Sequence, residues 1–519
     1  MLPIFMRASL GLVAVGLAGA AAAQEAAPAG HAIAPGATAA PRPQLGRAEA
    51  MLVLDYQLVR VPQEASLDLL GIHALSQLND WLYGGVGVHA PLLEGEYGGF
   101  MMFDVTVHAQ RRLWRNLFAN AGVSMGGGGG GKSKEQSRVL TGGGGFTKGY
   151  VGLGYEFEGF AVGANVTRLK FYRSIIDSTQ INVFVQVPFS TTVGSYASAG
   201  QRLPATDAQD AFADSSENTL TLGLDNLAQI DPQGSNHATV RLIDLQFAHY
   251  LNRNAYWYAS LGVGYHGMPL YNQLIGGLGI RYRISPRVDL HAQLGLGSGG
   301  WSPDRIDTGS GLLVYPKASA EYWIGRNWGL SLSAGYLFAP TGSSKNATFG
   351  AALNYHLQPE GRGARESSGG SLLEGYRINL FQQTALDVRD RDVEHGRINM
   401  LSAQFDTVVS DHVYIAVQGA VAYEAYRSYP GYGELVAGVG LQSKADKDSA
   451  FQFFAQVLGG TNAHGAVVKA GVGMNLGLND RLALYAAAGR TVAAPSNKTN
   501  FKSDNLALGL TYRFSLPGR

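Results

Sequence analysis

Three lysines recur in matching settings and are the residues of this chain most suggestive of a chemical role. Lys148, Lys317 and Lys469 each open an alternating segment shortly after a glycine-rich stretch. Lysines at one depth around a single lumen would favour anions or acidic polymers, as in other charge-lined pores. The alternative is that each lysine only reaches a rim or pairs locally. Further residues on the predicted inner faces complete the pore-lining candidates: Arg281, Arg283, Gln110, Gln293 and Gln456.

Other residues could in principle perform chemistry, but their settings favour simpler interpretations. His108 and His291 occupy matching positions, yet the third copy has Phe454 there, so we interpret both histidines as lumen-lining. Gly126 to Ser133 matches the phosphate-loop pattern, but no helix is predicted after it, which indicates an external loop. The set Ser124, His89 and Asp104 contains the residue types of a hydrolase triad at a spacing that is not diagnostic.

Composition limits the function classes. The chain has 519 residues, a formal net charge of +1 and no cysteine. The balanced charge gives no electrostatic reason for a nucleic-acid partner. Absent cysteine removes thiol catalysis, thiolate metal sites and disulfides. We therefore expect no cofactor, no metal site and no catalytic residues.

The first 46 residues indicate export. Arg7 precedes the apolar run Leu10 to Leu17 and the small residues Ala21-Ala22-Ala23. This arrangement is typical of a secretory signal peptide, so we expect residues 1–23 to be removed. The run is shorter than the roughly 20 residues that a spanning helix needs. The Ala/Pro-rich residues 24–46 are expected to form a disordered tether.

Internal repeats organise the remainder. A recurring Ala-Gln pair, a glycine-rich segment and a lysine appear three times, at a spacing that indicates duplication of a multi-strand unit. About eight strands are expected in each unit. In the second unit they are Leu220–Ala228, Val240–Tyr250, Tyr256–Tyr265, Leu274–Ile284, Val288–Leu296, Leu313–Ile324, Leu330–Phe338 and Phe349–Leu357.

The strands alternate between apolar and polar or small residues, and the connections alternate between short and long. Leu290, Leu294 and Leu296, for example, oppose Asp289 and Gln293. An apolar face on nearly every strand, with short turns on one rim and long loops on the other, is typical of a membrane barrel. Closure matters because only a closed sheet satisfies every backbone group in lipid.

The last strand strengthens this interpretation. Apolar residues alternate strictly with small or polar ones from Asn505 to Phe514, and the second half of this strand contains Gly509, Tyr512 and Phe514. This ending resembles the C-terminal assembly signal of bacterial outer-membrane β-barrel proteins of the porin-like type, although residues 515–519 follow the final aromatic. The resemblance implies an all-β transmembrane antiparallel barrel in the bacterial outer membrane. It also implies contacts with the barrel-assembly machinery, outer-membrane lipid and lipopolysaccharide.

Two architectures fit three units of about eight strands. One barrel of about 24 strands is favoured, because only the final strand carries a convincing terminal signal; tandem eight-stranded barrels are the alternative. The expected division is a first unit at 47–189, a linker at 190–218, a second unit at 219–357, a linker at 358–374, a third unit at 375–514 and a tail at 515–519.

The favoured function is an outer-membrane channel that passes solutes or an exported polymer without covalent chemistry. The alternatives are a membrane enzyme acting on lipid or lipopolysaccharide and a structural or adhesive barrel. The pattern does not identify a substrate or an oligomeric state.

Overall fold

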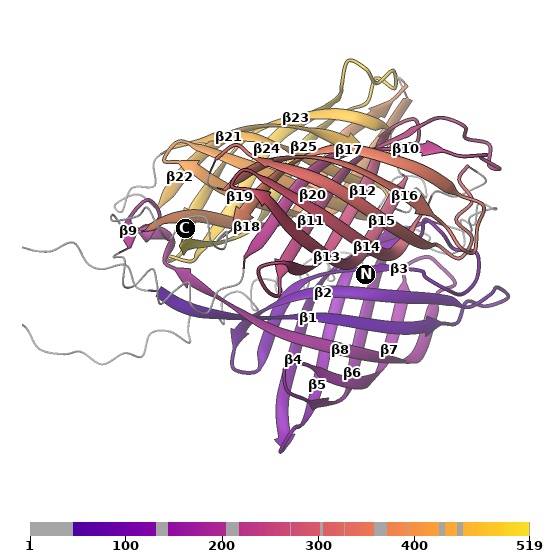
Figure 1. Cartoon of the computed structure of the whole chain (residues 1–519), viewed down its shortest axis with the longest axis horizontal. Coiled ribbons are helices and arrows are strands. Elements are labelled where there is room, and N and C mark those ends of the chain that lie inside the picture. Colours follow the sequence, from indigo (N-terminus) through magenta and orange to yellow (C-terminus); the bar gives the residue numbers. More distant parts are fainter. Residues whose placement is uncertain are drawn as a thin grey trace, which may run out of the picture.

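The computed structural model describes residues 45–517 apart from 131–143, 204–216, 270, 301–304, 326, 358–370, 392, 425–430 and 444–449. The expected signal peptide and most of the tether lie outside the described residues. Most described residues belong to antiparallel strands (Figure 1). In this part of the chain, no helix is long and apolar enough to cross a membrane.

The first eight strands close into a ring, named barrel 1. Strand β1 pairs with β2 on one side and with β8 on the other, and the strands between them pair in sequence order. Their bounds are β1 (Leu45–Val59), β2 (Leu67–Asn79), β3 (Leu82–Ala90), β4 (Met101–Trp114), β5 (Leu117–Gly129), β6 (Gly145–Glu156), β7 (Ala161–Phe171) and β8 (Asp177–Gly194).

Barrel 2 closes in the same way through the pairing of β10 with β11 and β17. Its strands are β10 (Asn218–Gln229), β11 (Val240–Tyr250), β12 (Ala255–His266), β13 (Asn272–Ser285), β14 (Val288–Gly300), β15 (Leu312–Trp323), β16 (Trp328–Phe338) and β17 (Lys345–Leu357). All eight strands expected in this unit are confirmed, with ends that differ by at most a few residues.

Barrel 3 closes through the pairing of β18 with β19 and β25. Its strands are β18 (Ser371–Asp390), β19 (Val393–Ser410), β20 (Val413–Glu424), β21 (Gly433–Gln442), β22 (Phe451–Asn462), β23 (Gly465–Gly477), β24 (Leu482–Ala493) and β25 (Lys502–Pro517). The expected single barrel of about 24 strands is therefore wrong, because each group of eight pairs its own first and last strands. The alternative, tandem eight-stranded barrels, is what the pairing shows.

The alternation of residue types follows the closed sheets. On β14, Leu290, Leu294 and Leu296 point outward and are exposed, whereas Asp289 and Gln293 point inward and are buried. The most exposed outward residues are 70–71% accessible and include Ile181 and Leu332. Apolar outer faces around polar interiors are the reverse of a soluble protein, and they fit barrels whose outer surface meets lipid.

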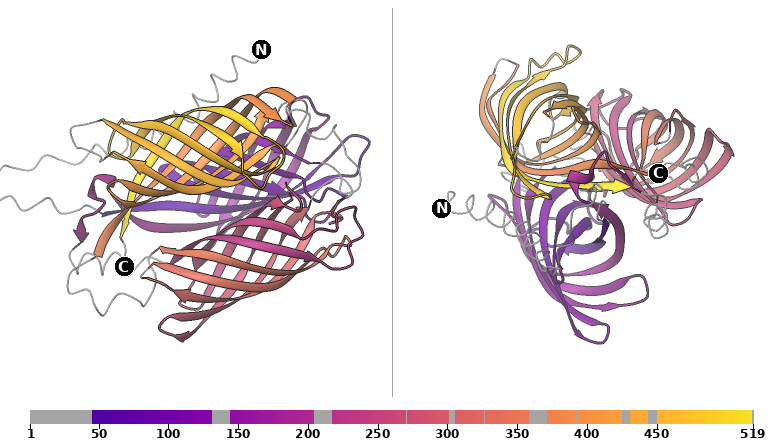
Figure 2. Two further views of the ribbon diagram at one scale, coloured as in Figure 1. Left: turned by 90° about the horizontal axis from the view of Figure 1, so that it is seen from above. Right: turned by 90° about the vertical axis from the view of Figure 1, so that its left-hand side faces the viewer.

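The three barrels lie side by side around a common axis (Figure 2, right). Their contacts include one repeated pattern, in which the fifth strand of one barrel meets the third strand of the next. Strand β5 contacts β20, β14 contacts β3, and β22 contacts β12. Such head-to-tail contacts close into a ring when the rotation between units allows it. One chain therefore has the arrangement of a cyclic trimer.

Glycine-rich strand ends allow the barrels to approach each other at the long-loop rim. A Cβ at Gly127 of barrel 1 would lie 2.6 Å from the Ala422 carbonyl carbon of barrel 3, and Gly144 forms a bridge with Glu424. Between barrels 2 and 3, Thr461 Oγ1 donates to the Gly264 carbonyl at 3.0 Å. This rim holds the glycine run that matched the phosphate-loop pattern; Gly126–Gly129 end strand β5, and Gly131-Lys132-Ser133 lie outside the described residues.

The opposite rim carries the connection from barrel 1 toward barrel 2. Strand β8 continues to Gly194, so the first residues of the expected linker are strand, and a short 3-10 helix η1 (Tyr196–Ser198) and strand β9 (Arg202–Leu203) follow. Strand β9 pairs with the start of β18, and Gly194 pairs with Ser515 of β25. Tyr355 of barrel 2 donates to Glu374 Oε2 of β18 at 2.5 Å. These contacts tie the barrels together at the short-turn rim.

Candidate functional site: the barrel interiors and the central cavity

The three recurring lysines lie in three different interiors, so the expected ring of cations around one lumen is wrong. Lys148 donates to Asp55 Oδ2 at 2.5 Å, and Lys317 donates to Asp225 Oδ2 at 3.5 Å. Lys469 donates to Gln383 Oε1 at 2.7 Å and to Glu434 Oε2 at 3.2 Å. The local pairing that was the alternative describes all three lysines.

The lysines nevertheless occupy equivalent places. Each comes from the sixth strand of its barrel, and each reaches a residue of the first strand: Asp55 on β1, Asp225 on β10 and Gln383 on β18. In barrel 3 the carboxylate comes instead from Glu434 on the fourth strand. A buried ammonium needs such partners, because an isolated charge in a barrel interior would be very costly.

The two arginines of the pore-lining set differ in their environments. Arg281 is buried inside barrel 2, where Nη1 donates to Glu217 Oε1 at 2.8 Å and the guanidinium lies over the Tyr250 ring. The Arg283 side chain is 41% exposed, and its Nε lies 3.5 Å from Asp289 Oδ1. Both arginines therefore belong to barrel 2 and face its carboxylates, not a lumen shared by the three units.

The three glutamines do not form one equivalent set. Gln293 and Gln456 lie on the fifth strands of barrels 2 and 3, where they donate to Gln246 and Gln404 respectively. Gln110 lies on β4, the fourth strand of barrel 1, with its Oε1 3.3 Å from His108 Nε2. The Ala-Gln alignment of the first unit is thus displaced by one strand, and His108 and His291 are likewise on non-equivalent strands.

The residues of the expected assembly signal lie on β25, which closes barrel 3. Gly509 packs against the β18 backbone, where a Cβ would lie 2.5 Å from the Phe381 Cα. The rings of Tyr512 and Phe514 lie 5.7 Å apart, and Phe514 stacks on Tyr376 of β18. The strand continues past Phe514 to Pro517, and the role of these residues in assembly stays a prediction.

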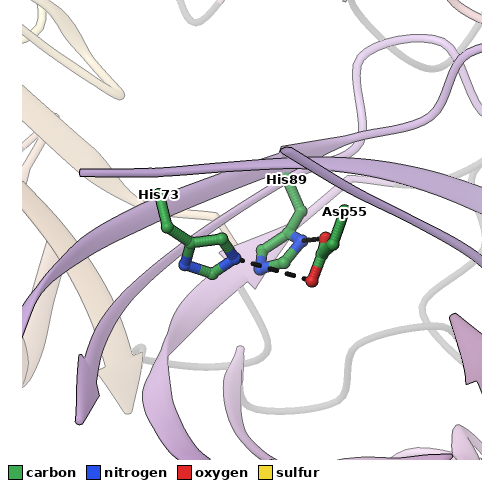
Figure 3. A group of neighbouring side chains, drawn as sticks. All are labelled: Asp55, His73 and His89. Atoms are coloured by element: carbon green, nitrogen blue, oxygen red, sulfur yellow. Dashed lines mark ion pairs between the residues drawn. The ribbon is translucent and has the colours of Figure 1, made fainter. Parts of the chain in front are cut away.

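Barrel 1 contains a buried cluster that the sequence did not predict (Figure 3). His73 Nε2 lies 3.7 Å from Asp55 Oδ2, and His89 Nδ1 lies 3.6 Å from Asp55 Oδ1. These atoms could together hold a metal ion, since they all lie within 4.8 Å of one another. The sequence alone shows only that the three residues lie on inward positions of expected strands. That they converge follows from the register of β1, β2 and β3.

The hydrolase-type residues are brought together in the same interior. His89 Nε2 lies 2.9 Å from Asp104 Oδ2, but Ser124 Oγ is 2.7 Å from Thr106 Oγ1. Ser124, His89 and Asp104 are at most 3% exposed. A nucleophile needs its base within hydrogen-bond reach and an open approach for substrate. The observed partner of Ser124 is a threonine, and the burial of the set leaves no such approach.

A large cavity lies between the barrels rather than inside one. Its volume is about 1260 Å³, and outward-facing, mainly apolar side chains of all three barrels line it. Barrel 1 contributes Ile72 and Val88, barrel 2 contributes Phe247, and barrel 3 contributes Leu401 and Ile415. A smaller cavity of about 50 Å³ lies within barrel 2.

The central cavity extends along the strands from one rim toward the other. On β12 it is lined from Trp257 to Val263, and on β19 from Leu401 to Thr407. At roughly 3.3 Å per residue, each stretch covers about 20 Å. Because the strands of such barrels tilt by about 35–45°, this length spans about 14–16 Å of an apolar band that is about 25 Å tall.

Comparisons with known proteins give only distant matches. No protein-family model matches the chain, and no curated protein matches it. Among solved structures, the outer-membrane protein Ail of Yersinia pestis is 17% identical over 27% of this chain and 99% of its own, with a TM-score of 0.20. The ferric enterobactin receptor PfeA of Pseudomonas aeruginosa is 11% identical over 90% of this chain and 81% of its own, with a TM-score of 0.28.

A further match, OccK5 of Pseudomonas aeruginosa, is 8% identical over 91% of this chain and 98% of its own, with a TM-score of 0.22. Matches this distant do not indicate a substrate or a mechanism for this chain. The closed antiparallel barrels with apolar outer faces are the physical basis for recognising the fold. The chain thus folds as three closed antiparallel β-barrels with apolar outer faces, the architecture of a transmembrane β-barrel protein.

Proposed function

We propose that this chain is an outer-membrane passage for amphipathic molecules, whose hydrocarbon parts occupy the central cavity between the barrels. The observation that carries the proposal is the apolar cavity of about 1260 Å³ lined by all three barrels. Ligand pockets commonly measure about 300–1,000 Å³. The cavity therefore has room for a molecule larger than a typical small ligand, and its lining favours hydrocarbon over water.

The barrel interiors support placing the passage outside them. Tyr256, Tyr258 and Tyr315 are buried in the interior of barrel 2, and Tyr414 and Tyr485 in that of barrel 3. An eight-stranded barrel leaves room for little more than its own side chains. The large aqueous lumen that a single barrel would have enclosed has no counterpart in a ring of three narrow barrels.

The ends of the cavity support an amphipathic occupant. Near the short-turn rim the lining includes Trp328 and Tyr355, whose rings suit a membrane interface. Near the long-loop rim it includes Asn272 and Arg305, with glycines such as Gly431 that add no bulk. An apolar middle between polar or aromatic ends matches a molecule with hydrocarbon chains and a polar head.

Location and partners follow from the same proposal. We place the protein in the bacterial outer membrane, after export directed by residues 1–23. There it contacts outer-membrane lipid and lipopolysaccharide. Insertion would use the barrel-assembly machinery, with Gly509, Tyr512 and Phe514 as the assembly signal. Duplication of an eight-stranded unit would account for the equivalent lysines and the cyclic contacts.

Lipid movement in proteoliposomes tests the proposed passage. Fluorescent NBD-phospholipid is placed in both leaflets, and dithionite, which reacts only with the outer leaflet, reports transfer from the inner one. We expect the protein to raise the fraction of probe that is reduced. The Gly419→Trp variant should slow this transfer at least tenfold, because Gly419 lines the cavity and a Cβ there meets no atom within 4 Å.

The matched control is Gly459→Trp, on the outer face of β22 in the same barrel, where a Cβ also meets nothing within 4 Å. The control should transfer lipid like the unmodified protein. Equal rates in both variants would contradict a passage through the cavity. Large ohmic conductance steps that Gly419→Trp leaves unchanged would instead favour an aqueous pore through a barrel.

A further inference from the structure

We propose that Asp55, His73 and His89 form a binding site for a divalent transition metal of the zinc class inside barrel 1 (Figure 3). The proposal is independent of the passage proposed above, because these side chains point inward from β1, β2 and β3, away from the central cavity. Imidazole nitrogen and carboxylate oxygen are the ligands that zinc and its neighbours in the first transition row accept.

The donor atoms lie near enough to one another for a single ion to bind them after limited side-chain movement. Donors around a tetrahedral zinc, with bonds of about 2.0 Å, lie roughly 3.3 Å apart. Here His89 Nδ1 and Asp55 Oδ1 are 3.6 Å apart, and the ligand atoms of Asp55, His73 and His89 all lie within 4.8 Å of one another. Closing these separations by at most about 1.5 Å would bring the donors onto one ion, with a fourth position left over.

The remaining nitrogens of both histidines face groups that would orient the rings. His89 Nε2 lies 2.9 Å from Asp104 Oδ2, which leaves Nδ1 to face Asp55. His73 Nδ1 lies 3.4 Å from Thr106 Oγ1 and 3.7 Å from Asp104 Oδ1. A carboxylate behind a metal-binding histidine fixes its tautomer and strengthens it as a ligand. Asp104 therefore contacts His89 directly and reaches His73 through Thr106, whose hydroxyl donates to Asp104 Oδ1 at 2.6 Å.

Two of the proposed donor atoms have no hydrogen-bond partner although they are buried. These atoms are Asp55 Oδ1 and His89 Nδ1, and they face each other. Both residues are at most 5% exposed. Leaving such atoms unsatisfied costs about 1–3 kcal/mol each, more for a charged group. A cation between them would satisfy both at once.

Two inward-facing glycines keep the cluster open. A Cβ at Gly71 would lie 2.5 Å from His89 Nδ1, and a Cβ at Gly87 would lie 2.6 Å from His73 Cε1. Any larger residue at either position would therefore push a ring out of place. Small residues on adjacent strands are needed if two imidazoles and a carboxylate are to converge in so narrow a barrel.

The charges of the cluster leave a negative excess. Asp55 and Asp104 are two carboxylates, and the ammonium of Lys148 donates to Asp55 Oδ2. Oδ1 of the same carboxylate is the atom without a hydrogen bond, so the lysine and a metal would use different oxygens. The equivalent lysine of barrel 3, Lys469, donates to Gln383 and Glu434. A buried lysine at this position therefore does not require histidines beside it.

Metal retention after refolding tests the site, since its burial indicates loading during folding. The full chain is refolded in detergent with zinc chloride, or with cobalt(II) chloride as a spectroscopic probe, and then washed with a chelator. We expect about one metal per chain and the visible absorption of low-coordinate cobalt. His73→Gln and His89→Gln should each lower retention at least tenfold, and Asp104→Asn should weaken binding by roughly 10–100-fold.

The matched control is His291→Gln in barrel 2, whose ring contacts Tyr256 and Glu321. This variant should retain metal like the unmodified chain. The cobalt spectrum of the unmodified protein does not depend on whether any variant folds. A spectrum of hexa-aquo cobalt only, or metal lost equally in His291→Gln and His89→Gln, would overturn the proposal.

Discussion

Replacement of Gly127 by alanine should separate barrel 1 from barrel 3. Gly127 lies near the end of β5, where the glycine-rich edge of barrel 1 meets β20. A Cβ there would lie 2.6 Å from the Ala422 carbonyl carbon and 3.1 Å from the Tyr423 nitrogen, and still closer to the Ala422 carbonyl oxygen. These are backbone atoms of a paired strand, so they cannot rotate away as a side-chain end could.

The magnitude follows from the overlap. Ordinary van der Waals contact of a Cβ begins at 3.4 Å, so the nearest carbonyl carbon alone is about 0.8 Å too close. Relief requires β5 and β20 to move apart, and overpacking of this kind costs about 1–3 kcal/mol. Because the three interfaces form a closed ring, the displacement also widens or distorts the other two.

Urea unfolding in lipid vesicles measures the effect, with Gly149→Ala as the control. Gly149 lies on β6 of the same barrel, and a Cβ there meets no atom within 4 Å. We expect Gly127→Ala to lose about 1–3 kcal/mol of unfolding free energy and Gly149→Ala to lose nothing. If both variants unfold within about 0.5 kcal/mol of the unmodified protein, the reasoning about close barrel contact is refuted.

Two further pairs of variants test the outer faces and the interiors of the barrels. Leu332 is 70% exposed on the outer face of β16, and Leu332→Arg places a charge there. This variant should lose about 2–4 kcal/mol of unfolding free energy in vesicles. Leu251→Arg, in a short connection, should lose about 0–1 kcal/mol. Equal costs would contradict lipid contact. Arg377→Met removes the partner of Asp406, 3.0 Å away in the interior of barrel 3, and should cost about 3–5 kcal/mol in urea unfolding. The double variant with Asp406→Asn should recover part of this loss, and no recovery would show that the pair is not the cause.

The individual strands could be predicted from the sequence because a two-residue period is a local property. Val240–Tyr250 was predicted with the bounds that the structure has, and the other strands of that unit differ only at their ends. The closure could not be predicted in this way. Whether β1 pairs with β8 or with a strand of another unit depends on contacts between residues more than 100 positions apart. An alternating pattern is the same for either pairing and so does not distinguish them.

The candidate site was only partly predictable for a similar reason. Repetition located the three lysines correctly on equivalent strands. Their partners were not visible, because Asp55 precedes Lys148 by 93 residues and becomes its neighbour only when the barrel closes. The central cavity was hidden in another way. Outward residues such as Ile72 and Phe247 have the apolar character of lipid-facing residues, so the sequence does not reveal which of them face a neighbouring barrel.

Joining three barrels in one polypeptide also removes a restriction that binds an assembly of identical subunits. In such an assembly every substitution appears three times around the axis. Here His73 and His89 lie beside Asp55 in barrel 1. In barrel 3, Lys469 contacts Gln383 and Glu434 instead. Each barrel interior can therefore evolve separately, and a single chain can combine a symmetrical frame with three unlike interiors.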